Sequence, residues 1–326
     1  MVIHITQDGV RGLKDDYGRE IDYLRISVTD RCNLRCRYCM PESGIDRVPR
    51  SEILTFEEIL KICRAAVGLG FRKFRLTGGE PLVRQGIPDF IKSLSEVDGA
   101  EDLAMTTNGI LLGGMAEQLK DAGLMRVNVS LDTLDPEKFK YMTRGGDIER
   151  VLDGIKKALC AGLYPVKINT VLIKGFNDGE IDDFIGITKL YPVDVRFIEL
   201  MPIGLAAGAG MDYISCAAVL EGRDLIPVGD DGVAAYYRIE NAMGKVGLIR
   251  PMSCKFCSRC NRLRLTSDGR LKPCLLNDAE VDIKGPLRRG EDISGIIRQA
   301  LNIKPREHEA DAGVHITSRD MNEIGG

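Results

Sequence analysis

The segment CNLRCRYC, residues 32–39, limits what this chain can be more than any other part of its sequence. It places Cys32, Cys36 and Cys39 on one short loop directly after an apolar run, and all three histidines of the chain lie far from it. An iron-sulfur cube normally takes four cysteine ligands, so a set of three leaves one iron with an open coordination site. Structural zinc sites are closed by four ligands, which disfavours zinc here. The loop therefore predicts an iron-sulfur cluster.

The open iron of such a cluster can hold a small molecule. S-adenosylmethionine (SAM) can chelate it through its amino and carboxylate groups, and an electron from the reduced cluster can then break a carbon–sulfur bond. The product is a 5'-deoxyadenosyl radical, which abstracts hydrogen. The spacing C-x3-C-x2-C, with Tyr38 between the last two cysteines and Met40 and Pro41 behind them, resembles the signature of the radical SAM superfamily. We therefore expect an enzyme that cleaves SAM.

With 44% hydrophobic and 29% charged residues, the 326-residue chain is long enough and apolar enough to bury a core. No apolar run approaches the length of a membrane span, and charges occupy the N-terminal stretch where a secretory signal needs an apolar core. We expect a cytoplasmic location, where the ten cysteines act as metal ligands or buried thiols. Cys160 and Cys216 stand outside any motif and are expected to be buried. A net charge of -3 predicts no general affinity for nucleic acid.

Short apolar runs alternate with helix-like segments over the first part of the chain. The runs are residues 23–28, 73–77, 103–107, 126–132, 166–173 and 193–200. This alternation is typical of a parallel α/β fold, and about six strand-helix units predict an incomplete (βα)6 barrel related to the TIM barrel. In such folds the chemistry sits at the carboxyl ends of the strands.

Thr55 and Glu58 form a capping box at the start of a predicted helix, whose apolar face includes Cys63. Later in the chain the strand-helix rhythm stops at a Gly/Ala-rich segment, which precedes short strands and further cysteines. We predict two domains, a partial barrel over residues 1–201 and an α+β C-terminal domain over residues 202–326.

Three cations interrupt predicted strands whose neighbours are apolar, namely Arg25, Arg75 and Lys167. A buried cation without a partner is costly, so these side chains need anions. A polyphosphate substrate would supply the charge and suits arginine forks, and pairing with acidic residues of the chain itself is the alternative. Hydroxyl and amide side chains at strand ends, such as Thr106 and Ser130, are suited to ligand contacts or to ordinary capping and turn roles.

A second group of cysteines comprises Cys254, Cys257, Cys260 and Cys274. Four thiolates could close a zinc site or hold a second iron-sulfur cube, and the spacing alone does not choose between them. Arg262 and Arg264 follow at once, and side chains two apart on a strand share one face. The pair is therefore expected to form one wall of a nucleotide site beside these cysteines.

Taken together, the motifs resemble the GTP 3',8-cyclase family, also known as molybdenum cofactor biosynthesis protein A. The motifs CNLRCRYCMP, TGGEP, TTNG, NVSLD, RFIELMP and FCSRCNRLRL, a later cysteine and a Gly-Gly terminus occur in one order over almost the whole chain. The resemblance implies two [4Fe-4S] clusters, a radical SAM barrel and a C-terminal domain that carries the second cluster. It also implies a radical SAM lyase that converts GTP to (8S)-3',8-cyclo-7,8-dihydroguanosine 5'-triphosphate, the first step of molybdenum cofactor biosynthesis. In that reaction the 5'-deoxyadenosyl radical abstracts H3' of GTP.

The resemblance also assigns residues to roles. The first cluster is expected on Cys32, Cys36 and Cys39, and the second on Cys257, Cys260 and Cys274. The expected SAM contacts are Tyr38, Gly79, Ser130 and Met201. The expected GTP contacts are Arg25, Arg75, Thr106, Lys167, Arg262, Leu263 and Arg264. Catalytic roles are expected for Arg262, Arg264, Gly325 and Gly326. Cys254 falls outside this ligand pattern, and its role stays open.

The implied partners are GTP, a reducing electron donor, a downstream cyclic pyranopterin monophosphate synthase and a second copy of the chain in a homodimer, with no nucleic acid and no membrane. Two alternatives remain. A radical SAM enzyme with an auxiliary cluster could modify a peptide, but a peptide does not need the strand cations. A non-catalytic iron-sulfur or zinc sensor would not cleave SAM.

Overall fold

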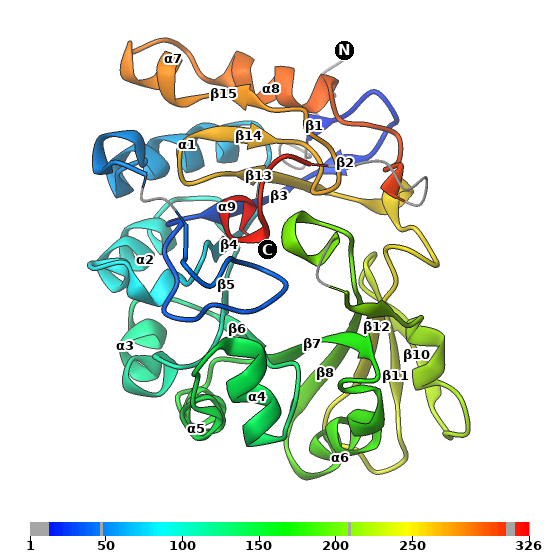
Figure 1. Cartoon of the computed structure of the whole chain (residues 1–326). Coiled ribbons are helices and arrows are strands. Elements are labelled where there is room, and N and C mark those ends of the chain that lie inside the picture. Colours follow the sequence, from blue (N-terminus) through cyan, green and yellow to red (C-terminus); the bar gives the residue numbers. More distant parts are fainter. Residues whose placement is uncertain (1–12, 46–47, 208–209, 311–316, 326) are drawn as a thin grey trace.

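The computed structural model describes residues 13–45, 48–207, 210–310 and 317–325. Its centre is a curved mixed sheet of thirteen strands, which follow an arc with helices on the outer side (Figure 1). The six middle strands are β3 (Tyr23–Ser27), β4 (Lys73–Thr77), β5 (Asp102–Thr107), β6 (Arg126–Ser130), β7 (Val166–Lys174) and β8 (Val193–Glu199). All six run parallel, each on one of the predicted apolar runs. The predicted incomplete barrel is confirmed.

Helices connect these strands as right-twisted parallel sheets require. They are α1 (Phe56–Gly68), α2 (Ile87–Ser95), α3 (Ala116–Asp121), α4 (Pro136–Thr143), α5 (Ile148–Cys160) and α6 (Ile181–Leu190). At the start of α1, Thr55 Oγ1 accepts from the Glu58 N–H at 3.2 Å, and Glu58 Oε2 accepts from the Thr55 N–H at 2.8 Å. The predicted capping box is thus present, and Cys63 lies in the core as expected.

Strands from the C-terminal part of the chain pair with both edges of the six-strand arc. On one edge β12 (Val246–Ile249) lies parallel to β8 and is followed by β11 (Ala234–Arg238) and β10 (Ile226–Asp230). On the other edge β13 (Arg262–Leu265) lies parallel to β3 and is followed by β14 (Arg270–Lys272) and β15 (Val281–Asp282). Because one sheet crosses the expected boundary between residues 201 and 202, that boundary stays a prediction.

Smaller elements complete the described chain. They are the hairpin β1 (Leu13–Lys14) and β2 (Glu20–Ile21), β9 (Asp212–Tyr213) against β7, and the helices α7 (Lys284–Arg288), α8 (Ser294–Asn302) and α9 (Met321–Ile324). The short α9, red in Figure 1, lies at the inner side of the arc. No helix of the described residues is both long and apolar enough to cross a membrane.

Two isolated cysteines behave differently from each other. Cys216 is fully buried, as expected. Cys160 is exposed, so the expectation of a buried thiol there is wrong. The physical reason is its position on α5, where the buried face carries Val151, Ile155 and Ala158 and where Cys160 is the last residue, off that face.

We expect Thr55→Ala to lower the free energy of unfolding of the cluster-free chain by about 1 kcal/mol, because the N–H of Glu58 loses its side-chain acceptor. Urea denaturation followed by circular dichroism measures this as a lower midpoint with an unchanged slope. Thr55→Ser keeps the hydroxyl and serves as the control. An equal loss of stability in both variants would contradict a role for the cap.

Candidate active site

The first three cysteines lie on the loop that follows β3. Its backbone is tied to the end of α4, since the N–H of Arg35 donates to the Thr143 carbonyl at 3.1 Å and the N–H of Arg37 to the Met142 carbonyl at 3.0 Å. Arg144 adds two bonds, from Nη1 to the carbonyls of Arg35 and Met40. The sequence-local motif is therefore held in shape by a helix that starts far along the chain.

The thiols of this loop influence one another electrostatically. Burial raises the pKa of Cys36 well above its ordinary value, and negative charge on Cys39 and Asp132 raises it further. The same two causes, burial and then the charge of Cys32, raise the pKa of Cys39 to about 12. Without a metal these thiols hold their protons at neutral pH, and metal binding would have to displace them.

Within residues 13–45, 48–207, 210–310 and 317–325, no three His, Cys, Asp or Glu side chains converge closely enough to hold a single metal ion. A closed zinc site would require such convergence. An iron-sulfur cube does not, because each thiolate binds a different iron and the ligands surround a cluster. The thiols of the two cysteine groups therefore form no single-metal site among the described residues.

Of the four residues expected to contact SAM, Tyr38 lies on this loop and the other three lie at the carboxyl ends of strands. Tyr38 Oη donates to Asp132 Oδ2 at 2.7 Å, just beyond the end of β6, where Ser130 is the last residue. Gly79 follows β4, and its N–H donates to the Thr29 carbonyl at 2.8 Å. Met201 follows β8. All four residues thus lie at or after the end of a strand or on the loop after β3, and their contact with SAM stays a prediction.

Glu80 connects the ends of β4 and β5. Its carboxylate is fully buried and accepts from the Asn108 N–H at 2.6 Å, Thr107 Oγ1 at 2.8 Å and the Leu82 N–H at 3.0 Å. Burial raises the pKa of Glu80 to about 7, against the opposing effect of these donors. In this structure Glu80 therefore fixes the TTNG turn against the GGEP turn.

Three arginines form a row across neighbouring strands. Arg264 on β13 lies opposite Arg25 on β3, which lies opposite Arg75 on β4. Burial, and then the charge of Arg264, lowers the pKa of Arg25 well below its usual range, and burial lowers the pKa of Arg75 and of Arg264 to about 10. Two like charges at the roughly 5 Å spacing of neighbouring strands repel by about 3 kcal/mol at an effective dielectric constant of about 20. An anion bound to the row would relieve this repulsion.

The row forms one wall of a cavity of about 170 Å³. The second group of cysteines forms another part of the same cavity, through Cys257, Cys260 and Cys274. Arg25, Arg75, Arg262, Arg264 and Met201 also line it. Cys254 is exposed and is absent from the lining. The cavity thus joins a three-thiol set to a dense group of cations.

Several donors at this cavity have no acceptor. Arg75 Nε and Arg262 Nε, both of residues that line the cavity, are buried and lack a hydrogen-bond partner among the described residues. Thr106 Oγ1 on β5 is likewise buried without a partner among these residues, but Thr106 is not part of the lining. Leu263 packs into the core. Lys167 is satisfied internally, because its ammonium donates to the Tyr236 hydroxyl at 2.8 Å and lies 4.0 Å from two carboxylates, those of Asp194 and Asp231. For Lys167 the alternative of internal pairing therefore describes this structure.

The short helix α9 and the residue after it, Gly325, contact the loop of the first cysteines and the arginine row. The backbone of Asn322 hydrogen-bonds the thiol of Cys39. The Gly325 carbonyl accepts from Arg264 Nη1 at 3.0 Å and from Arg25 Nη2 at 3.4 Å. Gly325 has φ +67°, and a Cβ there would overlap Thr77 Oγ1, so only glycine fits this approach. The other glycine expected to be catalytic, Gly326, lies outside the described residues.

Sequence reasoning missed two polar residues of the cavity. Arg196 on β8 and Asn169 on β7 both line it, and Arg196 Nε donates to Asn169 Oδ1 at 2.9 Å. Arg196 interrupts an apolar strand just as Arg25 does, so the same pattern could have identified it. His308 also lines the cavity and Lys304 contacts Cys260, but neither residue stands in a motif.

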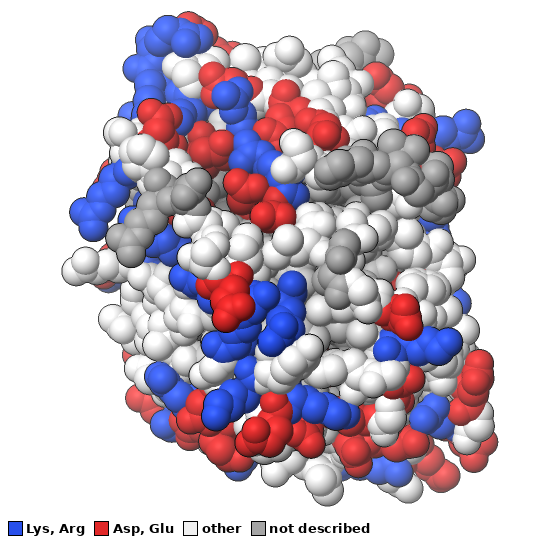
Figure 2. Space-filling model, in the orientation of Figure 1, with Lys and Arg blue, Asp and Glu red and all other residues white. Residues whose placement is uncertain are grey.

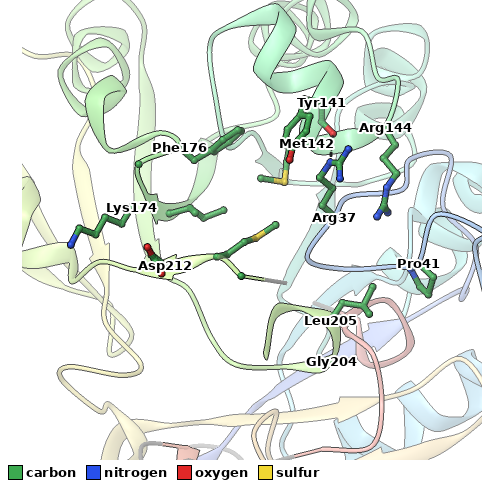
Figure 3. Close-up of a pocket in the computed structure, with 14 residues that line it drawn as sticks. Arg37, Pro41, Tyr141, Met142, Arg144, Lys174, Phe176, Gly204, Leu205 and Asp212 are labelled. Carbon is green, nitrogen blue, oxygen red and sulfur yellow. Dashed lines mark hydrogen bonds between the residues drawn. The ribbon is translucent and has the colours of Figure 1, made fainter. Parts of the chain in front are cut away.

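A second, open hollow of about 620 Å³ lies beside the first cysteine loop, which contributes Arg37 and Pro41 to its lining (Figure 3). Arg37 and Arg144 face it across from Phe176 and Lys174. It shares no lining residue with the cysteine-lined cavity. On the face shown in Figure 2 basic and acidic side chains are interspersed, so neither sign dominates that face.

Comparison with known proteins agrees with this geometry. The radical SAM superfamily model matches residues 26–186, and the Molybdenum Cofactor Synthesis C model matches residues 193–310. The GTP 3',8-cyclase of Peptoclostridium acidaminophilum is 55% identical over 320 residues, which cover 96% of this chain and 98% of that protein. The chain belongs to the GTP 3',8-cyclase family. The family member from Moorella thermoacetica is 49% identical over 325 residues, covering 96% of this chain and 100% of that protein.

Solved structures support the fold of this GTP 3',8-cyclase family member. Streptococcus suis SuiB bound to its precursor peptide SuiA superposes with a TM-score of 0.63 at 16% identity, over 90% of this chain and 75% of SuiB. SuiB bound to S-adenosylmethionine gives a TM-score of 0.62. At this identity the likeness concerns the fold alone. Membership of the radical SAM superfamily brings SAM and iron-sulfur clusters as cofactors.

We expect Gly79→Ala to prevent loading of the first cluster, because the added Cβ would overlap the carbonyl oxygen of Arg31 at the start of the cysteine loop. After anaerobic reconstitution the variant should hold roughly half of the parent's iron. Gly114→Ala, at a position with no atom near the added Cβ, is the matched control. Full iron content in Gly79→Ala would show that the loop tolerates the displacement.

Proposed function

We propose that this chain is a GTP 3',8-cyclase that converts GTP to (8S)-3',8-cyclo-7,8-dihydroguanosine 5'-triphosphate. The observation that carries the proposal is the shared cavity, in which three thiols and a row of buried arginines face the same space. Family membership supports the same reaction. A triphosphate would bring negative charge to the arginine row, which suits arginine forks.

The residues present fit the cofactors that the family uses. Cys32, Cys36 and Cys39 would hold the first [4Fe-4S] cluster, next to the strand-end positions expected to contact SAM. The first group offers three free thiols, which is one fewer than a closed cube requires, and in the second group three of the four free thiols line the cavity. When bound, the first cluster and SAM would supply a 5'-deoxyadenosyl radical that can take hydrogen from C3' of the GTP ribose.

At the second site Cys257, Cys260 and Cys274 would hold the other cluster. The exposed position of Cys254 supports a three-thiol set, which leaves one iron for a nitrogen or oxygen of the guanine. Arg75 and Arg262 line this cavity, and their guanidinium groups would bind phosphate oxygens.

The residues of the protein would hold the substrate in position and exclude water from the cavity. The arginine row fixes the triphosphate, and α9 contacts both the Cys39 loop and the row, so a single element reaches both ends of the substrate space. Holding C3' near the radical source and excluding water are the effects that such a cavity supplies.

The proposal also covers the partners of the chain and its location in the cell. We include in the proposal a reducing electron donor, transfer of the product to a cyclic pyranopterin monophosphate synthase, a homodimer and a cytoplasmic location. We also retain the proposed division into a barrel (1–201) and a C-terminal domain (202–326), although the two family models meet earlier, between residues 186 and 193.

The test is an anaerobic assay with reconstituted chain, dithionite, SAM and GTP, in which mass spectrometry follows 5'-deoxyadenosine and the GTP-derived product. Formation of both in parallel is expected. Cleavage of SAM with GTP untouched would refute the substrate and favour an enzyme that modifies another molecule, such as a peptide. No reaction by a chain with confirmed clusters would refute the enzyme.

We expect Arg264→Ala, or Arg262→Ala, to lower cyclisation of GTP by about 100-fold or more while SAM is still cleaved, because electrostatic clamps on phosphate are worth that much. Formation of 5'-deoxyadenosine without GTP consumption is the readout. Arg270→Ala removes a cation on the adjacent strand that pairs with Asp282, and it should behave as the parent. Equal loss of both activities in Arg264→Ala would contradict a substrate role.

Gly325→Ala is expected to lower cyclisation by about 10- to 100-fold with the iron content unchanged, because the new Cβ displaces the end of α9 from Thr77. Gly295→Ala, on α8 with no atom near the added Cβ, controls for the substitution itself. Cyclisation at the parent rate in Gly325→Ala would exclude a need for this close approach.

A further inference from the structure

Residues 304–308, which follow α8, cover the second group of cysteines. Lys304 is the first of them, and only 3% of this residue is exposed. Its ammonium donates to the Pro273 carbonyl at 2.6 Å, to the Arg262 carbonyl at 2.8 Å and to Cys260 Sγ at 3.6 Å. An ammonium has three N–H donors, and these contacts use all of them.

A second buried cation fixes this covering segment in place. Arg19 donates through Nη1 to the carbonyls of Cys257, at 2.9 Å, and Arg306, at 3.0 Å, and through Nη2 to that of Pro305 at 2.8 Å. The backbone of His308 hydrogen-bonds the Cys257 thiol. Two of the three thiols thus receive a hydrogen bond from residues outside the cysteine motif.

The two cysteine groups differ in the charge of the groups that donate hydrogen bonds to their thiols. At the first group, Cys32 Sγ accepts hydrogen bonds from the backbone N–H of Leu34 at 3.4 Å and from the side-chain amide of Asn108 at 3.7 Å, and both donors are neutral. At the second group the donor to Cys260 is an ammonium. A cluster gains negative charge on reduction, so a buried cation bonded to one of its thiolates stabilises the reduced form more than the oxidised form.

We propose that Lys304 is a positioning residue of the second cluster, which raises its reduction potential through Cys260 and joins the segments that carry Cys260 and Cys274. This inference rests on the proposed function, in which Cys257, Cys260 and Cys274 are cluster ligands. Pro273 precedes Cys274 directly, so the two carbonyl bonds of Lys304 tie one ligand segment to the other. Outer hydrogen bonds of this kind orient ligands and tune potentials.

The experiment isolates the second cluster in the full-length chain by the substitutions Cys32→Ala, Cys36→Ala and Cys39→Ala. In this background, Lys304→Met should lower the one-electron potential by at least 59 mV in a redox titration followed by electron paramagnetic resonance. That shift corresponds to a tenfold change in the equilibrium constant for reduction.

Lys272→Met in the same background is the matched control. Lys272 is also a fully buried lysine beside the second group, but its ammonium donates to the Asn277 carbonyl and lies 3.7 Å from Glu280. We expect a clearly smaller shift for it. An unchanged potential in Lys304→Met, or an equal shift in Lys272→Met, would overturn the proposal.

Iron content decides the case in which Lys304→Met loses the cluster. In that case Lys304→Gln, which keeps N–H donors without the charge, is titrated in place of Lys304→Met. Its reduction potential is also expected to be lower than that of the parent background. Loss of iron from both Lys304 variants but not from Lys272→Met would support the joining role. If the parent background binds no iron, the ligand assignment and this proposal fall together. A potential that depends on Lys304 in this background, together with no cyclisation of GTP by the reconstituted chain with all its cysteines, would refute the proposed function alone.

Discussion

Three buried guanidinium groups side by side on adjacent strands are the constraint on which the rest of this structure depends. Arg264, Arg25 and Arg75 repel one another, and burial makes each charge more costly. A fold can retain such a row only if something negative or strongly accepting meets it. In this structure the Gly325 carbonyl meets part of it, and under the proposed function a triphosphate would meet the remainder.

This row exists because of how the sheet is assembled. β3 and β4 come from the radical SAM segment, whereas β13 comes from the C-terminal segment. Their parallel pairing brings Arg264 next to Arg25, and the cysteines before and after β13 are carried to the same cavity. Neither segment alone contains the site. The candidate site therefore lies where the segments matched by the two family models pair in one sheet.

Much of this could be predicted from the sequence, because the informative patterns are local. The six apolar runs became the six parallel strands, and two of the cations that interrupt them, Arg25 and Arg75, line one cavity. Arg196 also interrupts an apolar strand, so the same pattern would have identified it. Lys304 could not be found this way, since its contact with Cys260 depends on how α8 packs against the sheet. The internal partners of Lys167 likewise depend on strand register and on Tyr236 from a distant strand.

The pairing of β3 with β13 also has a consequence for how the chain reaches its native state. During synthesis β3 emerges early and β13 only near the end, so one edge of the parallel sheet stays without its hydrogen-bonding partner until most of the chain exists. Parallel pairings between such distant segments form slowly, and open strand edges invite association with other chains. Because β13 also carries Arg262 and Arg264, a nascent chain that stalls before it would expose an aggregation-prone edge and lack these two arginines of the cavity at the same time.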